Sequence, residues 1–293
     1  MSSKRGTATL LREPAKRNRQ AHLPIAVVQK AYAQGLEAQH PSREQLLWRL
    51  SRFARGLELV SEIETIRGGL ENARIADLGA AHGGDCCAFL TAGAQPVAVD
   101  FRNHGYTALN DSLRAIGTKL DVILANVIDT LPFGDSSVDV VVAINLLEHV
   151  PDTTKFLLDL WRVLKPGGVV LLTTPVAWRH VWSDPFYRSP FTALLPMPLR
   201  RAVAVRLFGR TYPFPLSGKT CYSSRSITAP AARVGFAANA CKYKDSPVAR
   251  RVGRWPLRRL WLSLIRRYAF DFVVLQKSGA GTSASTVVSR SSL

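Results

Sequence analysis

The sequence Arg74-Ile75-Ala76-Asp77-Leu78-Gly79-Ala80-Ala81-His82-Gly83-Gly84 decides the fold of this chain, together with the run Ala94-Gln95-Pro96-Val97-Ala98-Val99-Asp100 that follows it. A short apolar run enters a turn of small residues. A helix-compatible segment comes next, and a second apolar run ends on a carboxylate. This order predicts one strand–helix–strand unit with parallel strands.

The turn and the carboxylate together indicate a nucleotide-cofactor site. Gly79 and Gly83 suit a turn in which the backbone approaches a ligand closely. Asp100, at the carboxyl end of the second strand, can accept two hydrogen bonds from the vicinal hydroxyls of a ribose. The glycine pattern alone is weak, because its middle position is Ala81. Asp100 at the right distance strengthens it, and a doubly wound domain that binds nothing is the alternative.

Four further motifs follow in order, within residues 120–126, 129–142, 145–150 and 162–172. The succession resembles the class I S-adenosylmethionine-dependent methyltransferases, specifically the type 11 group, closely over about residues 74–175 and more loosely to a final strand near Lys277. The resemblance implies a doubly wound, Rossmann-like α/β fold. Its mostly parallel seven-stranded sheet would have an antiparallel last strand and helical insertions. It also implies S-adenosyl-L-methionine as the cofactor.

The resemblance also implies which residues bind the cofactor. In that family the first loop holds the methionine part, the acid after the second strand holds the ribose, and the end of the third strand contacts adenine. Carried onto this sequence, the cofactor-binding set is Asp77, Gly79, Ala81, Gly83, Asp100, Phe101, Asn126, Val127 and Asn145. Asn126 stands where the family often has Asp, and its amide can both accept from and donate to adenine. Ala81 replaces the usual glycine and makes the loop stiffer.

A nicotinamide-dependent dehydrogenase is the nearest alternative for the first loop. Its fingerprint places glycines at closer intervals. It also does not predict the segments Leu131-Pro132-Phe133 and Lys165-Pro166-Gly167-Gly168. The order of motifs therefore favours the methyltransferase interpretation.

Charge is distributed unevenly along the chain. The net charge is +18 overall, but residues 75–175 hold 6 basic against 11 acidic residues, whereas residues 176–293 hold 20 basic against 3 acidic ones. An anionic partner for the basic part is therefore expected. We predict six segments: a basic flexible arm (1–40), an N-terminal helical segment capped by Ser42 (41–73), the cofactor-binding core (74–175), a substrate-lid insertion (176–222), the C-terminal part of the fold with a basic amphipathic helical insert (223–277) and a disordered tail (278–293).

The lid insertion is rich in aromatic and basic residues just beyond the fifth strand, where ligands of open α/β folds bind. His180 and Asp184 are weak candidates for a general base if the acceptor is a hydroxyl. Packing within a lid is the more ordinary role for each of them. The sequence assigns no catalytic residue beyond these two.

A second distinctive region, residues 246–270, combines seven arginines with tryptophans and aliphatic residues. Such a surface suits the headgroup layer of an anionic membrane. Packing of the apolar face on the sheet, with solvated arginines, is an equally good interpretation.

The four cysteines, Cys86, Cys87, Cys221 and Cys241, lack metal-ligand spacing, so no metal site is predicted. An adjacent cysteine pair is a strained partner for a disulfide, which favours a reduced, cytoplasmic setting. No apolar run is long enough to span a bilayer and the charged start lacks a signal-peptide core. We expect a cytoplasmic protein, peripheral on the inner membrane face if residues 246–270 bind lipid.

The leading function is methyl transfer by in-line displacement to a small-molecule or lipid-linked acceptor, with a glycan precursor among the candidates. An RNA methyltransferase is the second, motivated by the basic arm and the positive C-terminal third. Against it, no RNA-binding module is recognisable, and Asn145 is not followed by the Pro-Pro-aromatic motif of base-amine methylating families. The third is a cofactor-binding protein without turnover. The acceptor, the attacked atom and the oligomeric state are not encoded in any recognisable motif.

Overall fold

The computed structural model describes residues 22–175, 184–212, 216, 224–241 and 272–278. Its strands are β1 (Arg74–Leu78), β2 (Gln95–Asp100), β3 (Asp121–Leu124), β4 (Val138–Ile144), β5 (Leu164–Thr173), β6 (Phe236–Cys241) and β7 (Phe272–Lys277). Its α-helices are α1 (Ile25–Glu37), α2 (Arg43–Arg67), α3 (Gly84–Thr91), α4 (Tyr106–Arg114), α5 (Thr153–Val163), α6 (Met197–Phe208) and α7 (Ser224–Val234). Two short 3₁₀ turns, η1 (Leu147–His149) and η3 (Thr192–Leu194), complete the described elements.

The strands form one seven-stranded sheet in the order β3-β2-β1-β4-β5-β7-β6. Neighbours from β3 to β5 are parallel, whereas β7 runs antiparallel to both β5 and β6. The predicted sheet with its antiparallel last strand is therefore confirmed. The strand order reverses between β1 and β4, and ligands of open α/β sheets bind outside the carboxyl ends of the strands at such a point.

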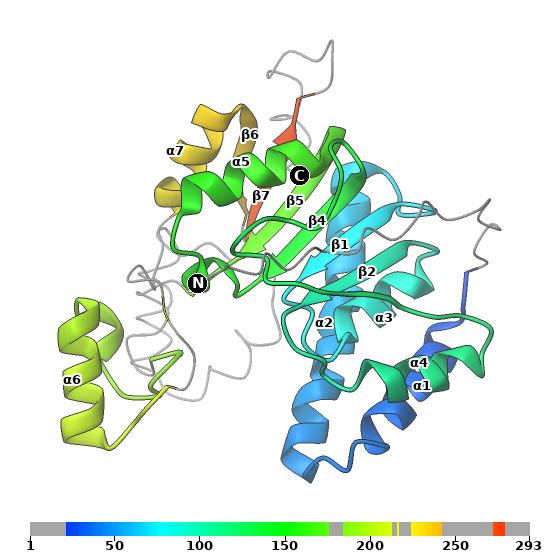
Figure 1. The fold of residues 1–293 in the computed structure, drawn as a ribbon, viewed down its shortest axis with the longest axis horizontal. Helices are drawn as coiled ribbons and strands as arrows, with labels where there is room; N and C mark the ends of the chain where they lie inside the picture. Colours follow the sequence, from blue (N-terminus) through cyan, green and yellow to red (C-terminus); the bar gives the residue numbers. More distant parts are fainter. Residues whose placement is uncertain (1–21, 176–183, 213–215, 217–223, 242–271, 279–293) are drawn as a thin grey trace, which may run out of the picture.

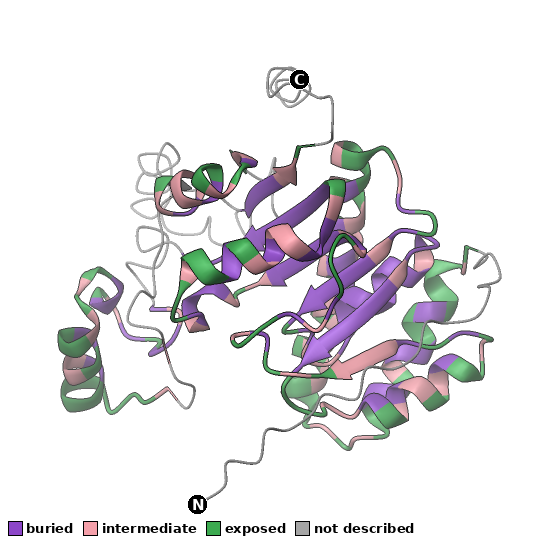
Figure 2. Ribbon diagram, turned by 45° about the horizontal axis from the view of Figure 1, so that its top comes forward, coloured by how far each residue is buried: buried purple, intermediate pink, exposed green. Residues whose placement is uncertain are grey.

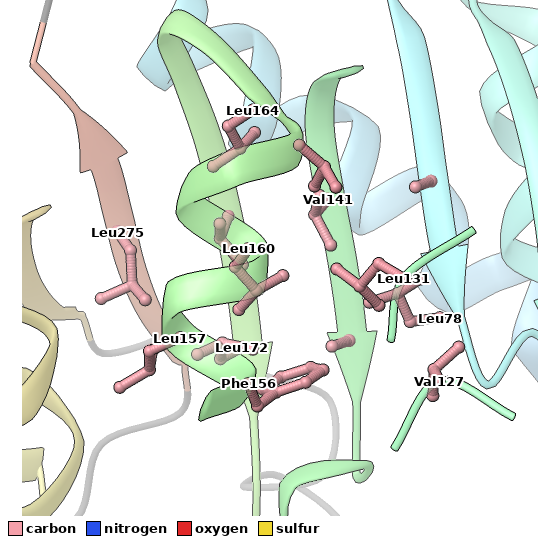
Figure 3. Close-up of a cluster of buried hydrophobic side chains, with 14 of the residues drawn as sticks. Leu78, Val127, Leu131, Val141, Phe156, Leu157, Leu160, Leu164, Leu172 and Leu275 are labelled. Atoms are coloured by element: carbon pink, nitrogen blue, oxygen red, sulfur yellow. The ribbon is translucent and has the colours of Figure 1, made fainter. Parts of the chain in front are cut away.

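Helices cover both faces of the sheet (Figure 1). On one face, α5 and α7 bury Phe156, Leu160 and Ile227 against alternate residues of the central strands, and Figure 3 shows part of this cluster. On the other face, the second half of α2 buries Leu59 and Ile63 against β1, β4 and β5. The sheet is consequently buried between two helical layers, as the colouring in Figure 2 shows.

Helix α2 begins after the predicted cap Ser42 and ends at Arg67, within the predicted helical segment 41–73. The Ser42 side chain accepts from the Gln45 backbone N–H, and the Gln45 side chain accepts from the Ser42 N–H, which is a complete capping box. The helix is followed by its C-cap Gly68, in the left-handed conformation with φ +88°. Its first half buries Phe53 against α3, so α2 connects the sheet to the turn that precedes α3.

The prediction of a flexible arm over residues 1–40 is wrong for its second part. Residues 25–37 form α1, which buries Val28, Ala31, Tyr32 and Leu36 against α3 and α4. These apolar residues recur at helical spacing, and burial of that stripe provides the free energy that orders the segment. Residues 1–21, the basic region 246–270 and the tail beyond Ser278 lie outside the described residues.

Close packing of α2 on α3 generates the first prediction. A Cβ added at Gly56 would lie 2.6 Å from the Ala88 Cβ and 2.8 Å from the Asp85 Cα. We expect Gly56→Ala to destabilise the protein by about 1–3 kcal/mol, because overpacking outweighs the gain in helix propensity of about 1 kcal/mol. Urea unfolding measures the difference. The matched substitution at exposed Glu58 in the same helix should stay within about 0.5 kcal/mol, and a stabilised Gly56→Ala variant would contradict the observed packing.

Candidate functional site

The glycine-rich turn between β1 and α3 is fastened to the end of β2. The N–H groups of Gly79 and Ala80 both donate to the Val99 carbonyl, at 2.8 and 3.2 Å. Gly79 and Gly83 have φ values of +74° and +73°, a conformation that glycine adopts without steric cost. Ala81 between them has φ +47° and carries a Cβ, so the loop is strained at that position. Non-glycine residues held in this way concentrate at ligand sites.

Asp100 connects this turn to the loop after β2. Its Oδ2 accepts from the Ala81 N–H at 2.9 Å. Its Oδ1 accepts from the Arg102 N–H at 3.1 Å and lies 3.2 Å from the His104 Nε2. Burial alone would raise the pKa of Asp100, but the hydrogen bonds from His104, Arg102 and Ala81 outweigh it and the pKa is lowered. Asp100 is therefore a carboxylate at neutral pH, and one acceptor position on Oδ2 is left for a ligand hydroxyl.

Asp77 lies beneath the turn and supports the helix that follows. Its Oδ2 accepts from the Cys86 thiol at 3.2 Å, and the side chain is fully buried. Burial, followed by the neighbouring charge of Asp85, raises the pKa of Asp77. Asp85 itself is paired with Arg55 from α2. The described contacts of Asp77 are thus within the protein, and its predicted role toward a cofactor stays a prediction.

Tyr106, the first residue of α4, carries an unsatisfied polar group at the same place. Its side chain is 4% exposed and its hydroxyl has no hydrogen-bond partner among the described residues. The ring lies beside Gly83, where an added Cβ would be 3.5 Å from Tyr106 Cε1. A buried hydroxyl without a partner is costly, so this group indicates that a polar ligand or water completes the site.

A group of rings surrounds the turn on its outer side. His82 packs edge-on against Trp48 of α2 and against His104, with ring centroids 6.3 and 5.0 Å apart. The Arg52 guanidinium lies 4.3 Å from the centre of the Trp48 ring. Burial, and then the positive charge of Arg49, lowers the pKa of His82 to about 4. His82 is consequently neutral at physiological pH and acts here as an aromatic wall.

The predicted cofactor-binding residues that follow β2 and β3 lie in different environments. Phe101 is 60% exposed and carries the Arg102 guanidinium over its ring. Asn126 is also exposed, and its amide bonds to Asp129 and to the Ile128 N–H. Val127, in contrast, packs into the hydrophobic core beside Leu131 (Figure 3). The side chains of Phe101 and Asn126 are thus accessible to a ligand, whereas that of Val127 is not.

The turn after β4 faces the glycine loop across the strand order reversal. Asn145 has φ +52° and donates its N–H to the Thr173 carbonyl. The next side chain, Leu146, approaches to 3.5 Å of the position that a Gly79 Cβ would take. The predicted residue Asn145 and the predicted loop are therefore brought together at the carboxyl edge of the sheet.

The same turn contains a buried carboxyl that the sequence analysis did not select. Glu148 is 2% exposed and accepts a 3.4 Å hydrogen bond from the Thr174 hydroxyl. Burial raises the pKa of Glu148 to about 7. Its charge in turn raises the pKa of Tyr212, after the burial of that phenol. Tyr212 stacks on His149, with centroids 6.4 Å apart and planes inclined by 13°.

Asp184 is enclosed by the lid segment. Its carboxylate accepts from the Phe186 and Tyr187 backbone N–H groups at 2.8 and 2.9 Å, and it is paired with the buried Arg200 of α6. Burial would raise the pKa of Asp184, but the bonds from Arg200 and from the two amides lower it. These are the contacts of a structural anchor and make Asp184 a poor base. Its proposed partner His180 lies outside the described residues.

Among the residues that the structure describes, no three His, Cys, Asp or Glu side chains are arranged to hold a metal ion. None of the described helices has the length and apolar character needed to cross a membrane.

Known proteins resemble this chain over the same region. The type 11 family model described as a methyltransferase domain matches residues 76–172. A Mycolicibacterium smegmatis protein named "Probable S-adenosylmethionine-dependent methyltransferase" is 43% identical over 63 residues, which are 22% of this chain and 24% of that protein. An uncharacterized methyltransferase of Mycobacteroides abscessus is 30% identical over 117 residues, 40% of this chain and 43% of the relative. The matched segments thus span less than half the length of these relatives.

A solved structure supports the fold assignment. An S-adenosylmethionine-dependent methyltransferase from Mesorhizobium loti superposes with a TM-score of 0.50 at 18% identity, covering 75% of this chain and 99% of that structure. The sheet order, the loop between β1 and α3, the acid that ends β2 and the family match agree with one another. Residues 76–172 thus match a methyltransferase domain within a Rossmann-like fold, and together these findings support a class I S-adenosylmethionine-dependent methyltransferase, with S-adenosyl-L-methionine as the implied cofactor.

Proposed function

We propose that this protein transfers a methyl group from S-adenosylmethionine to a small-molecule or lipid-linked acceptor, a class that includes glycan precursors. The observation that carries the proposal is the hydrogen bond from the Ala81 N–H to the Asp100 carboxylate. It joins the glycine turn to the ribose-binding acid at the carboxyl edge of the sheet, where cofactors of this fold class bind.

The residues present fit this cofactor. Asp100 is ionised and keeps an acceptor position for a ribose hydroxyl, and the Tyr106 hydroxyl beside Gly83 needs a polar partner. The Asp100 carboxylate lies beside the turn with its pKa lowered, which suits a ligand with a positively charged sulfonium. When bound, S-adenosylmethionine supplies a methyl group that is already activated by its sulfonium centre.

The protein's own contribution is to orient the acceptor and, where the acceptor is a hydroxyl, to remove its proton. Orientation of two reactants can supply about 7–11 kcal/mol in well-arranged systems. A hydroxyl acceptor must also lose a proton near the transition state, whereas a neutral amine need not. Glu148, buried in the turn opposite the glycine loop with its pKa raised to about 7, is the carboxyl that we propose to accept this proton.

The two alternative functions, an RNA methyltransferase and a binding protein without turnover, predict different experimental results. An RNA methyltransferase would incorporate methyl groups into RNA and bind it with steep salt dependence; the basic regions that motivated this alternative, 1–21 and 246–270, lie outside the described residues. A binding protein without turnover would take up the cofactor but label no fraction of a cell extract.

Replacing Asp100 tests the cofactor site. We expect wild-type protein to bind S-adenosylhomocysteine in the micromolar range by calorimetry, and Asp100→Ala to weaken binding by about ten-fold or more, because hydrogen bonds to a charged group contribute about 1.5–3 kcal/mol. NADH should not bind. Asp111→Ala removes an exposed carboxylate from the neighbouring helix α4 and serves as the matched control.

Unchanged affinity in Asp100→Ala would refute the assigned role of this carboxylate. Absence of binding to folded wild-type protein, or binding of NADH in place of S-adenosylhomocysteine, would refute the proposed cofactor.

Glu148 generates a prediction about stability and pH. Its pKa rises from an ordinary 4.5 to about 7 on folding, so the folded state favours the protonated form. This contribution to stability is complete below pH of about 4.5 and is lost as the pH rises through about 7. Glu148→Gln cannot ionise at this position, so it does not lose stability as the pH rises through about 7. Between pH 4.5 and 8 its free energy of unfolding should therefore improve relative to the wild type by about 3 kcal/mol.

Urea unfolding of both proteins across this pH range measures the change. Glu64→Gln, at an exposed position in α2, should follow the wild type at every pH. A constant difference between Glu148→Gln and the wild type would show that Glu148 titrates normally, and would remove it as the proton acceptor.

A further inference from the structure

The lid segment lines an open hollow, and none of the predicted cofactor-binding residues contributes to its wall. It has a volume of about 770 Å³ and lies between α6 and the chain around Tyr212. This volume is within the usual range for small-molecule sites, about 300–1,000 Å³. In Figure 1, α6 stands apart from the sheet and its covering helices, so the hollow belongs to the lid and not to the core.

The walls of the hollow combine apolar surface with positive charge. Met197, Val205 and Leu216 contribute aliphatic surface, and Tyr187 and Tyr212 contribute rings. Arg201 and Arg206 also line it, from positions on α6 that lie on either side of Val205 along the chain. Tyr187 and Tyr212 pack against each other and against buried Ala204 in one cluster, which fixes the inner wall.

The two arginines are available to a ligand. Both are exposed, and neither pairs with an acid in the part of the chain that the structure describes. The neighbouring sequence cannot neutralise them either, because residues 185–244 contain no Asp or Glu. Unpaired guanidinium groups at the edge of an apolar hollow are suited to a phosphate or a carboxylate on an apolar body.

One wall of the hollow is shared with the proposed reaction site. Tyr212 lines the hollow, stacks on His149 and is close enough to Glu148 for that carboxyl to raise its pKa. His149 and Glu148 belong to the turn that faces the glycine loop. Tyr212 therefore connects the wall of the hollow to the turn that carries Glu148.

We infer that this hollow is the acceptor subsite, that it binds the apolar body of an amphiphilic anion, and that Arg201 and Arg206 hold the anionic group. The assignment of the ligand as the methyl acceptor rests on the proposed function, whereas the chemistry of the hollow does not. It narrows the acceptor class to molecules that carry a phosphate or carboxylate on an aliphatic or aromatic body.

Calorimetry with n-octyl phosphate as the probe tests this inference on the full chain. We expect saturable binding of octyl phosphate, with much weaker binding of 1-octanol or inorganic phosphate alone. The double variant R201Q/R206Q should bind octyl phosphate about ten-fold more weakly or worse. The variant R210Q/R233Q removes two exposed arginines outside the hollow and should retain wild-type affinity. Val205→Trp, which fills the hollow without changing the charge, should also weaken binding.

Equal weakening by R210Q/R233Q, or no effect of Val205→Trp, would overturn the inference, because binding would then follow net charge and not the hollow. S-adenosylhomocysteine titrated into the same samples separates the two proposals. If it binds and octyl phosphate does not, the subsite is wrong and the proposed function stands. If octyl phosphate binds and S-adenosylhomocysteine does not, the subsite stands and the cofactor assignment fails.

Binding to lipid vesicles distinguishes a membrane lipid from a soluble amphiphile as the source of the anionic group. Sedimentation with phosphatidylglycerol vesicles that is lost in R201Q/R206Q would support a lipid as the source of the anionic group. Octyl phosphate binding without sedimentation would support a soluble amphiphile. Sedimentation that persists in R201Q/R206Q, combined with absent octyl phosphate binding, would overturn the inference.

Discussion

The site depends on one hydrogen bond between a backbone amide and a buried carboxylate. The Ala81 N–H donates to Asp100, and this contact fixes the glycine turn after β1 to the end of the neighbouring strand β2. Because the turn leads directly into α3, its position also sets where that helix begins. The carbonyl of Val99 accepts two further N–H groups from the same turn, so the loop is held at three points although one of its residues has an unfavourable backbone conformation.

The charges around the two proposed binding sites match the two proposed ligands, a cationic cofactor and an anionic acceptor. Three buried carboxyl groups, those of Asp77, Asp85 and Asp100, lie around the glycine turn; Asp85 is paired with Arg55, and Asp100 lies 3.2 Å from the His104 ring nitrogen. This acidic environment favours a cationic cofactor. The lid segment (176–222) has the opposite character, since its one acidic residue, Asp184, is paired with Arg200. Tyr212 and His149 lie where the two regions meet, and the methyl acceptor would approach the cofactor from the basic side.

Much of the fold and part of the site could be predicted from the sequence. The alternation of strands and helices, the cap at Ser42 and the acid after β2 are each encoded by residues close together in the sequence. Such features can be recognised from a single sequence. Helix α1 was missed because six basic residues in the first 19 positions dominate the composition there, although Val28, Tyr32 and Leu36 follow helical spacing. Val127 was placed in the cofactor site by its position in a motif, which does not show that its side chain is buried in the core.

Glu148, Tyr106 and the residues of the hollow were also missed, because their properties depend on the tertiary structure. Glu148 stands in a motif that was recognised, yet its raised pKa results from burial, which no spacing reveals. Tyr106 and His104 follow Asp100 by six and four positions, and polar ring residues so close to the predicted ribose-binding acid were the available signal. The hollow beside α6 brings together Tyr187, Val205 and Leu216, whose proximity is a property of the tertiary structure alone.

A crystal structure of the protein with S-adenosylhomocysteine tests the central claim most directly. We expect the ribose hydroxyls to donate hydrogen bonds to the Asp100 carboxylate. We also expect the His104 ring to have moved away from Oδ1, and the Ala81 N–H still to donate to Oδ2. A ligand bound away from Asp100, or a glycine turn detached from β2 in the complex, would contradict it.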